Sequence, residues 1–300
     1  MKKVLIAGGT GFVGKALIKH LLNGGYTVHV LTRRQNTPSI GNAQYFQWDI
    51  EKGSIDEQAF EGVTEIINLT GVSIIEKRWT KKRKAEIIES RTKAIDLLYQ
   101  YVHALSTPVN TFISSSAVGY YGAVTSNELF TETSENGNDF VASVCKQWEK
   151  AALRFESLNI PTVILRKGVV LGKDGGMYQK LAPLAKSSIN VSLGDGQQYL
   201  PWIDIRDLVR LYAFILQTKK MQGIFNAVSS EHITMNDLSN TLLGSFGKKS
   251  FLPNVPTFLI KLRFGKMSAM LLEGSKVSNE KLSEKGFHFE YDTILKAFRW

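Results

Sequence analysis

Short apolar runs alternate with longer stretches of helical periodicity over the first two-thirds of the chain. The runs predicted to form strands are residues 3–7, 27–31, 44–48, 64–69, 109–115 and 161–166. Between them, residues 12–23, 80–104 and 139–158 repeat their apolar positions at the spacing of an amphipathic helix. Strands that alternate with helices are typical of βαβ units, whose right-handed crossovers give a parallel sheet. The pattern therefore predicts an α/β fold with a doubly wound parallel sheet.

The pattern changes after about residue 170, where glycine-containing turns interrupt shorter elements. We expect helices at 176–187, 205–217 and 234–244, a short strand at 223–228, and further helical patterns near 256–272 and 277–284. This division predicts one domain over residues 1–170 and a smaller mixed lobe over 171–300, with residues 250–300 as a distinct C-terminal part. Continuation of the core strands to about residue 228 is the alternative boundary.

The first predicted strand runs directly into three glycines at threefold spacing, Gly8, Gly11 and Gly14, and then into a helix. In such a strand–turn–helix the first glycine serves the turn, the second the approach of a phosphate, and the third the packing of helix against strand. The bare N–H groups and the helix dipole favour an anion. We therefore predict a Rossmann-type dinucleotide site. The other residues of this loop expected to contact the cofactor are Thr10, Phe12 and Val13.

The second predicted strand ends in two arginines, Arg33 and Arg34. An NAD-selective site usually has an acidic residue here for the ribose 2′-hydroxyl, whereas the planar guanidinium group binds phosphate. The sequence thus favours NADP(H) over NAD(H). An ordinary basic loop is the alternative explanation.

Composition excludes several classes of protein. The 300 residues carry a formal net charge of +10, but no nucleic-acid-binding motif accompanies the basic cluster at 77–84, so we expect no nucleic-acid partner. No window approaches the roughly 20 apolar residues of a membrane span, and we expect no membrane partner. The single cysteine, Cys145, fits a reducing cytoplasm, and the five histidines show no metal-ligand spacing. We predict a cytoplasmic protein without a metal.

The whole chain resembles the extended short-chain dehydrogenase/reductases, the NAD-dependent epimerase/dehydratase-like proteins. The marks of the resemblance are GGTGFVG at 8–14, INLTGV at 67–72, SSSAVGYYG at 114–122, Trp148-Glu149, and the segment 165–172. Segments 77–91, 194–209 and 284–291 resemble a bacterial branch of epimerase-like oxidoreductases with its own C-terminal domain. Some members of that branch carry the label of cell-division inhibitor.

The resemblance implies further cofactor contacts at the ends of the later strands. These residues are Asp49, Thr70, Gly71, Ser114, Lys167, Gly168 and Val169.

The catalytic pair of the resembled group, a Tyr-xxx-Lys on the helix after the serine strand, is missing here. With Glu149 as the anchor, its positions fall on Val141 and Cys145. The remaining candidates are Ser116, as the substrate-side hydroxyl, and two phenols nearby. These phenols are Tyr120 and Tyr121, which could instead only form the wall of the pocket.

Two functions stay open from the sequence. The first is an NADP-dependent oxidoreductase or epimerase-like enzyme acting on a carbonyl or sugar-like small molecule. The second is a catalytically degenerate NAD(P)-binding regulator, which the missing Tyr-xxx-Lys pair favours. Either is expected as a monomer or a homodimer.

Overall fold

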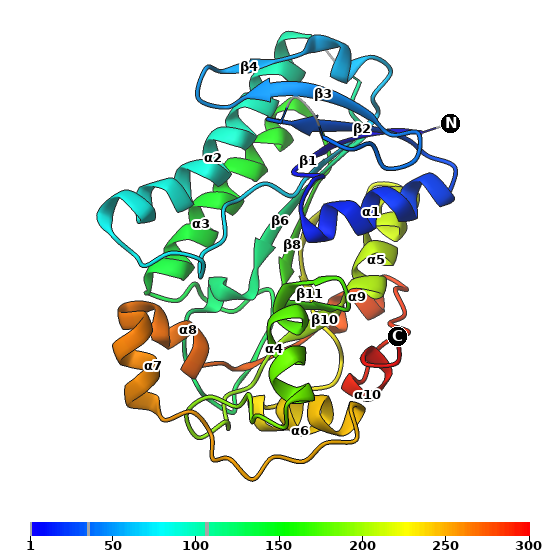
Figure 1. Ribbon diagram of the computed structural model, residues 1–300. Coiled ribbons are helices and arrows are strands. Elements are labelled where there is room, and N and C mark those ends of the chain that lie inside the picture. Colours follow the sequence, from blue (N-terminus) through cyan, green and yellow to red (C-terminus); the bar gives the residue numbers. More distant parts are fainter. Residues whose placement is uncertain (1, 35–36, 106–107) are drawn as a thin grey trace.

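A computed structural model describes residues 2–34, 37–105 and 108–300, and its centre is one eight-stranded sheet (Figure 1). The strand order is β11-β8-β6-β5-β1-β2-β3-β4. The bounds are β1 Lys3–Ala7, β2 Thr27–Thr32, β3 Gln44–Asp49, β4 Ser54–Ile55, β5 Glu65–Asn68, β6 Thr111–Ala117, β8 Thr162–Lys167 and β11 Gly223–Ala227. Every pairing is parallel except that of β4 with β3. The predicted doubly wound parallel sheet is confirmed.

Helices cover both faces of the sheet (Figure 1). The pair α1 (Phe12–Asn23) and α5 (Ile205–Gln217) lies on one face, and the pair α2 (Lys81–Ala104) and α3 (Phe140–Leu153) on the other. Alternate residues of β1 divide between the two cores, Val4 and Ile6 facing α1 and α5, Leu5 and Ala7 facing α2 and α3. Burial on both faces explains why the strand sequence is a continuous apolar run rather than an alternating one.

Side-chain caps fix where three of these helices begin. Thr80 accepts a hydrogen bond from the Arg83 N–H at the start of α2, Asp139 caps α3 in the same way, and Asp204 caps α5. The first turn of α1 is different, because its N-cap is Gly11 and no side chain accepts its N–H groups. This end of α1 is therefore left with free backbone donors.

A smaller lobe lies beyond the carboxyl ends of the parallel strands (Figure 1). Its elements are β7 Leu129–Phe130, β9 Val169–Gly172, α4 Gly176–Lys186, β10 Trp202–Asp204, α6 Met235–Ser245, α7 Thr257–Phe264, α8 Ala269–Leu272, β12 Lys276–Val277 and α10 Ile294–Ala297. Parallel pairs β9–β10 and β7–β12 brace it, and a separate apolar core holds it together around Trp202 and Leu238. Although they follow residue 170, α5 and β11 belong to the main sheet layer.

Two expectations for the C-terminal part differ from the structure. The helical pattern at 256–272 is divided at Gly265, where φ is +55°, into α7, a 3₁₀ turn and α8. The predicted helix at 277–284 is wrong in its first part. Lys276 and Val277 pair with β7 as strand β12, and α9 covers only Glu280–Glu284 against β11. The cause is tertiary, because β7 offers a strand edge that local periodicity does not reveal.

Candidate functional site

The glycine turn after β1 has the geometry that its spacing predicts. Gly8 has φ of +84°, and a Cβ there would lie 2.9 Å from the carbonyl carbon of Leu69. A Cβ on Gly14 would lie 2.6 Å from the backbone of Gly9, so only glycine lets α1 pack this close. A Cβ on Gly11 would meet only the Gly8 carbonyl oxygen, at 3.6 Å. The space above Gly11 and the uncapped start of α1 together fit a diphosphate group.

A cleft of about 250 Å³ opens from this turn along the carboxyl ends of β1, β2 and β5. Its lining includes Gly8, Thr10, Gly11, Thr32, Arg33, Trp48, Thr70 and Gly71. Asp49 lies in an adjoining hollow of about 470 Å³, where Arg33 and Trp48 recur. Its carboxylate accepts hydrogen bonds from the N–H groups of Glu51 and Lys52. The cleft has the place and the shape for the adenosine half of a dinucleotide.

The two arginines after β2 differ in position. Arg33 lines both the cleft and the hollow, whereas Arg34 lines neither. The Arg34 backbone instead closes the loop, with its N–H donating to Thr32 Oγ1 and its carbonyl accepting from Gln47. Of the two, Arg33 is the guanidinium group placed for a 2′-phosphate.

The carboxylates of the adjoining hollow are paired with cations. Glu51 and Glu89 both reach Lys93, at 3.7 and 2.8 Å, and Glu86 pairs with Arg83 at 2.8 Å. These pairs reduce the repulsion that free carboxylates would exert on a phosphate near Arg33. The donor set of the cleft therefore fits NADP(H).

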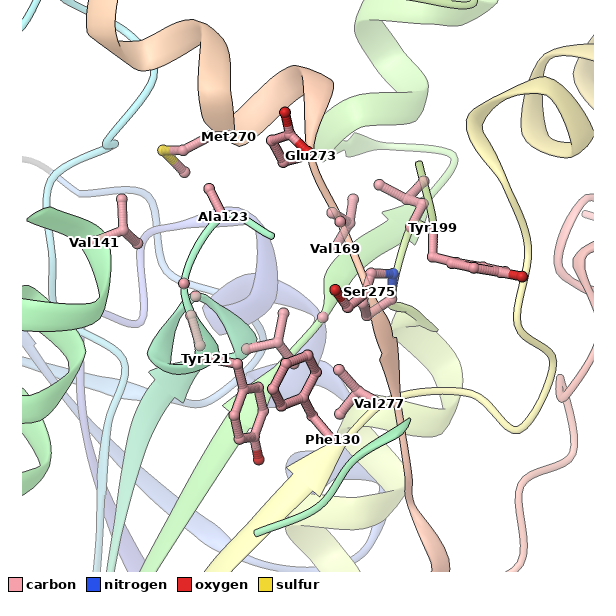
Figure 2. A pocket seen from close by; sticks show the side chains of 18 of the residues that line it. Tyr121, Ala123, Phe130, Val141, Val169, Tyr199, Met270, Glu273, Ser275 and Val277 are labelled. Atoms are coloured by element: carbon pink, nitrogen blue, oxygen red, sulfur yellow. The ribbon is translucent and has the colours of Figure 1, made fainter. Parts of the chain in front are cut away.

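A second cavity, of about 260 Å³, lies between the end of the main sheet and the smaller lobe (Figure 2). The 3₁₀ turn Val118–Tyr121, the start of α3, the segment 167–169, residues 199–201 and the stretch 270–277 line it. Lys167, Gly168 and Val169, the residues expected at the nicotinamide end of a cofactor, are part of this lining. Segments separated by more than a hundred residues build this cavity, and the sequence alone did not bring them together.

Lys167 carries a cationic group at the sheet end of this cavity. Its Nζ donates to Ser115 Oγ at 2.8 Å, and Ser115 Oγ lies 3.2 Å from the hydroxyl of Tyr212. Burial, with a smaller contribution from the charge of Arg91, lowers the pKa of Lys167 to about 8. Burial also raises the pKa of Tyr212. A lysine with a depressed pKa in a cavity is a common feature of functional sites.

The other polar groups of the lining are already engaged. Asp139 caps α3 and also accepts from the Ala123 N–H at 2.6 Å. Glu273 accepts from Thr125, and Ser275 donates to the carbonyl of Val124. The Tyr121 and Tyr199 hydroxyls point away from the cavity (Figure 2).

The predicted serine of the site, Ser116, is in a buried network behind the cavity. Its Oγ donates to Glu149 Oε1 at 2.6 Å, and Glu149 forms a bidentate ion pair with Arg166, with both N–O distances at 2.9 Å. Ser114 is also fully buried and donates to the carbonyl of Ser115. Neither side chain is part of the lining of either cavity.

The two candidate tyrosines pack on the same network. The Arg166 guanidinium lies 3.4 Å from the ring centroid of Tyr120, and it donates to the Tyr121 hydroxyl at 3.1 Å. That hydroxyl in turn donates to Asn226 at 2.6 Å, and burial raises the pKa of Tyr121. Tyr121 contributes the side of its ring to the cavity wall, and its oxygen is held by the interior.

Of the two helix positions expected to correspond to the Tyr-xxx-Lys pair, Val141 and Cys145, the cavity lining includes Val141 (Figure 2). Cys145 is buried one turn further along α3. Burial raises the pKa of the Cys145 thiol to about 12, so it is uncharged at neutral pH. Arg91 packs over Trp148 on α3, with 4.9 Å between its guanidinium carbon and the ring centroid.

Several contacts that shape the site were not predicted from the sequence. The Phe12 ring, expected at the cofactor, packs so closely on the segment 172–176 that a Cβ on Gly175 would lie 2.4 Å from it. The ring thus joins the phosphate loop to the smaller lobe. Met270, Glu273 and Val277 enter the cavity from the far end of the chain. No local motif marks any of these contacts.

Residues 2–34, 37–105 and 108–300 contain no cluster of three or more His, Cys, Asp or Glu side chains that could hold a metal ion. No helix in the described part of the chain is long and apolar enough to cross a membrane.

Two family models match separate regions of this chain. The sequence model of the NAD dependent epimerase/dehydratase family matches residues 4–227, and a domain of unknown function, DUF1731, matches residues 255–300. The epimerase family protein SDR39U1 homologue, chloroplastic, of Arabidopsis thaliana is 32% identical, with 99% of this chain and 85% of that protein covered. An epimerase family protein of Staphylococcus saprophyticus is 33% identical, with 99% and 98% covered.

A solved structure agrees over the whole fold. The human epimerase family protein SDR39U1 (isoform 2), solved with NADPH, is 28% identical and has a TM-score of 0.88, with 99% of this chain and 98% of that chain covered. The family match spans the glycine turn, the cleft beside Arg33 and the whole parallel sheet, and the resemblance expected from the sequence is confirmed. This chain belongs to the NAD dependent epimerase/dehydratase family.

Proposed function

We propose that this protein is an NADP(H)-dependent oxidoreductase or epimerase-like enzyme that acts on a small carbonyl or sugar-like molecule. The observation that carries the proposal is the presence of two sites at the carboxyl ends of the strands of one sheet. The cleft over Gly11 and Arg33, at the ends of β1, β2 and β5, fits a dinucleotide phosphate, and the cavity at Lys167 opens at the ends of β6 and β8. The similarity to the human protein solved with NADPH supports the cofactor.

The chain's own residues divide the work. The N–H groups at the start of α1 and the Arg33 guanidinium bind phosphate. At Thr70 and Gly71 the protein backbone approaches the cofactor, and Lys167 meets the substrate end. The nicotinamide ring, when bound, supplies the hydride donor or acceptor. We propose a small-molecule substrate, no nucleic-acid or membrane partner, a monomer or homodimer, and a cytoplasmic location.

Cofactor titration of the purified protein tests the nucleotide site. Nicotinamide fluorescence measures the binding, and we expect NADPH to bind more tightly than NADH. Arg33→Ala should remove most of that preference, because loss of a charged hydrogen-bonding group costs about 1.5–3 kcal/mol of binding free energy. Arg34→Ala is the matched control, because its side chain lines neither part of the cleft. Equal losses of NADPH affinity in both variants would mean that the preference comes from the general basic charge of the loop. Absence of NADPH binding by the folded protein would refute the proposal.

A nucleotide-binding regulator is the second candidate function. The observation that favours it is the replacement of the family's helix pair by Val141 and the uncharged thiol of Cys145. A regulator would bind NADPH with the same dependence on Arg33 but would not oxidise it with any carbonyl compound. Consumption of NADPH by the wild-type protein, lost in Lys167→Met, would exclude this second candidate.

A further inference from the structure

We propose that the 260 Å³ cavity binds an uncharged, largely apolar carbonyl compound and not a nucleotide sugar, with the substrate oxygen on the Lys167 ammonium group. This inference rests on the proposed function and specifies the substrate class of the same site. It depends on three properties of the cavity: its apolar walls, its charge, and the position of its one cation.

The walls of the cavity are apolar where a sugar would need polar partners. Val141, Val169, Met270, Val277 and the ring of Phe130 form them, and the two phenol groups nearby turn their hydroxyls away (Figure 2). A site built to hold hydroxyl groups pairs each of them with donors and acceptors, since an unpaired buried hydroxyl costs free energy. Here the carboxylates and the serine hydroxyl of the lining already have partners within the protein.

The charge of the cavity also excludes a diphosphate. Among the described residues that line it, Asp139 and Glu273 carry two negative charges and Lys167 one positive charge. The whole chain has a net charge of +10, so this local excess of carboxylates stands out against the rest of the surface. An adjoining pocket of about 140 Å³ has Lys266 and again Asp139 in its lining. Diphosphates are bound by groups of arginines, lysines or free N–H donors, which this lining lacks.

Lys167 is positioned to hold one substrate oxygen. Its Nζ makes a single hydrogen bond among the described residues, to Ser115 Oγ, and an ammonium group has three N–H donors. Lys167 itself is part of the cavity lining, beside Gly168 and Val169, and we assign its remaining donors to a substrate oxygen there. Glycine is required at 168, since a Cβ there would lie 2.5 Å from the Pro201 carbonyl oxygen. The lysine is thus held at the junction between the strand end and the smaller lobe.

The experiment uses 4-(dimethylamino)cinnamaldehyde, an apolar aldehyde whose absorption shifts to longer wavelength when its carbonyl oxygen meets a cation. NADPH binding is measured first and independently, which separates a failure of the proposed function from a failure of this inference. The aldehyde is then titrated into protein saturated with NADP⁺, with UDP-glucose as the competitor. We expect saturable binding, a red shift, and no competition by UDP-glucose.

Three variants sharpen the result. Lys167→Met should still bind the aldehyde but lose the red shift. Met270→Trp should weaken aldehyde binding at least tenfold, because the larger side chain fills the cavity. Lys173→Met, which removes an exposed lysine, is the control and should behave as the wild type. Competition by UDP-glucose, absence of aldehyde binding, or a red shift unchanged in Lys167→Met would each overturn the inference while leaving the NADPH result standing.

Discussion

The dinucleotide cleft and the cavity proposed for the substrate are built in different ways. The cleft depends on a continuous run of chain, from β1 through the glycine turn into α1, and adds short stretches at the ends of β2, β3 and β5 and one residue of α2. The cavity collects residues from 74 to 277, and a buried ion pair and the C-terminal lobe hold it together. A local motif therefore forms the cofactor cleft, while tertiary packing forms the cavity proposed for the substrate. Substitutions should affect the two regions by correspondingly different mechanisms.

The largest expected effect is in the network behind the cavity. Glu149→Ala leaves the Arg166 guanidinium, 1% exposed, without its carboxylate, and we expect a loss of about 3–5 kcal/mol in the free energy of unfolding. Urea denaturation measures it. Asp96→Ala, which removes an exposed ion pair to Arg154, is the control and should cost at most about 1 kcal/mol. Similar costs in the two variants would contradict the role given to this network.

Lys167→Met should stabilise the protein and yet impair its site. The lysine pKa falls from 10.5 to about 8 on folding, so the unfolded chain binds more protons between those pH values. The free energy of unfolding of the wild type therefore rises with pH from 8 to 10.5. Below pH 8 the buried lysine is charged, and its burial lowers the stability by the full amount. Removal of this charge gains up to about 3 kcal/mol at pH 7, and the gain disappears near pH 10.5.

Urea denaturation of Lys167→Met at pH 7 and pH 10 checks this sign, with Lys173→Met as the neutral control. A destabilised variant at pH 7 would mean that Lys167 is a structural residue. Gain of stability with loss of ligand contact is the expected signature of a functional residue held in an unfavourable environment.

A smaller effect is expected at the glycine turn. Gly14→Ala adds a methyl group 2.6 Å from the Gly9 backbone, which we expect to cost about 1–3 kcal/mol and to displace the phosphate site. Gly244→Ala is the matched helical control, because nothing lies within 4 Å of its Cβ, and it should gain up to about 1 kcal/mol. Thermal unfolding measures the stability of both variants, and NADPH titration measures the phosphate site. Unchanged NADPH binding by Gly14→Ala would contradict this prediction.

The same difference explains why roles could be predicted from the sequence for some candidate residues and not for others. Gly8, Gly11 and Gly14 could be assigned roles because a turn and a helix start depend on neighbouring residues. Ser116 and Tyr121 could not, because the partners that engage them, Glu149 and Asn226, are separated from them by 33 and 105 residues.

By itself the sequence determined the strand–helix alternation, the parallel sheet, the phosphate turn and the basic end of β2. These features follow from the apolar period of buried strands, from the conformational freedom of glycine and from the fixed charge of arginine. Only the tertiary structure decided that Arg33 and not Arg34 lines the cleft, that Lys276 and Val277 form a strand, and that Lys167 is the cation of an apolar cavity. Each of these outcomes depends on burial and on contacts between distant segments, which local sequence does not encode.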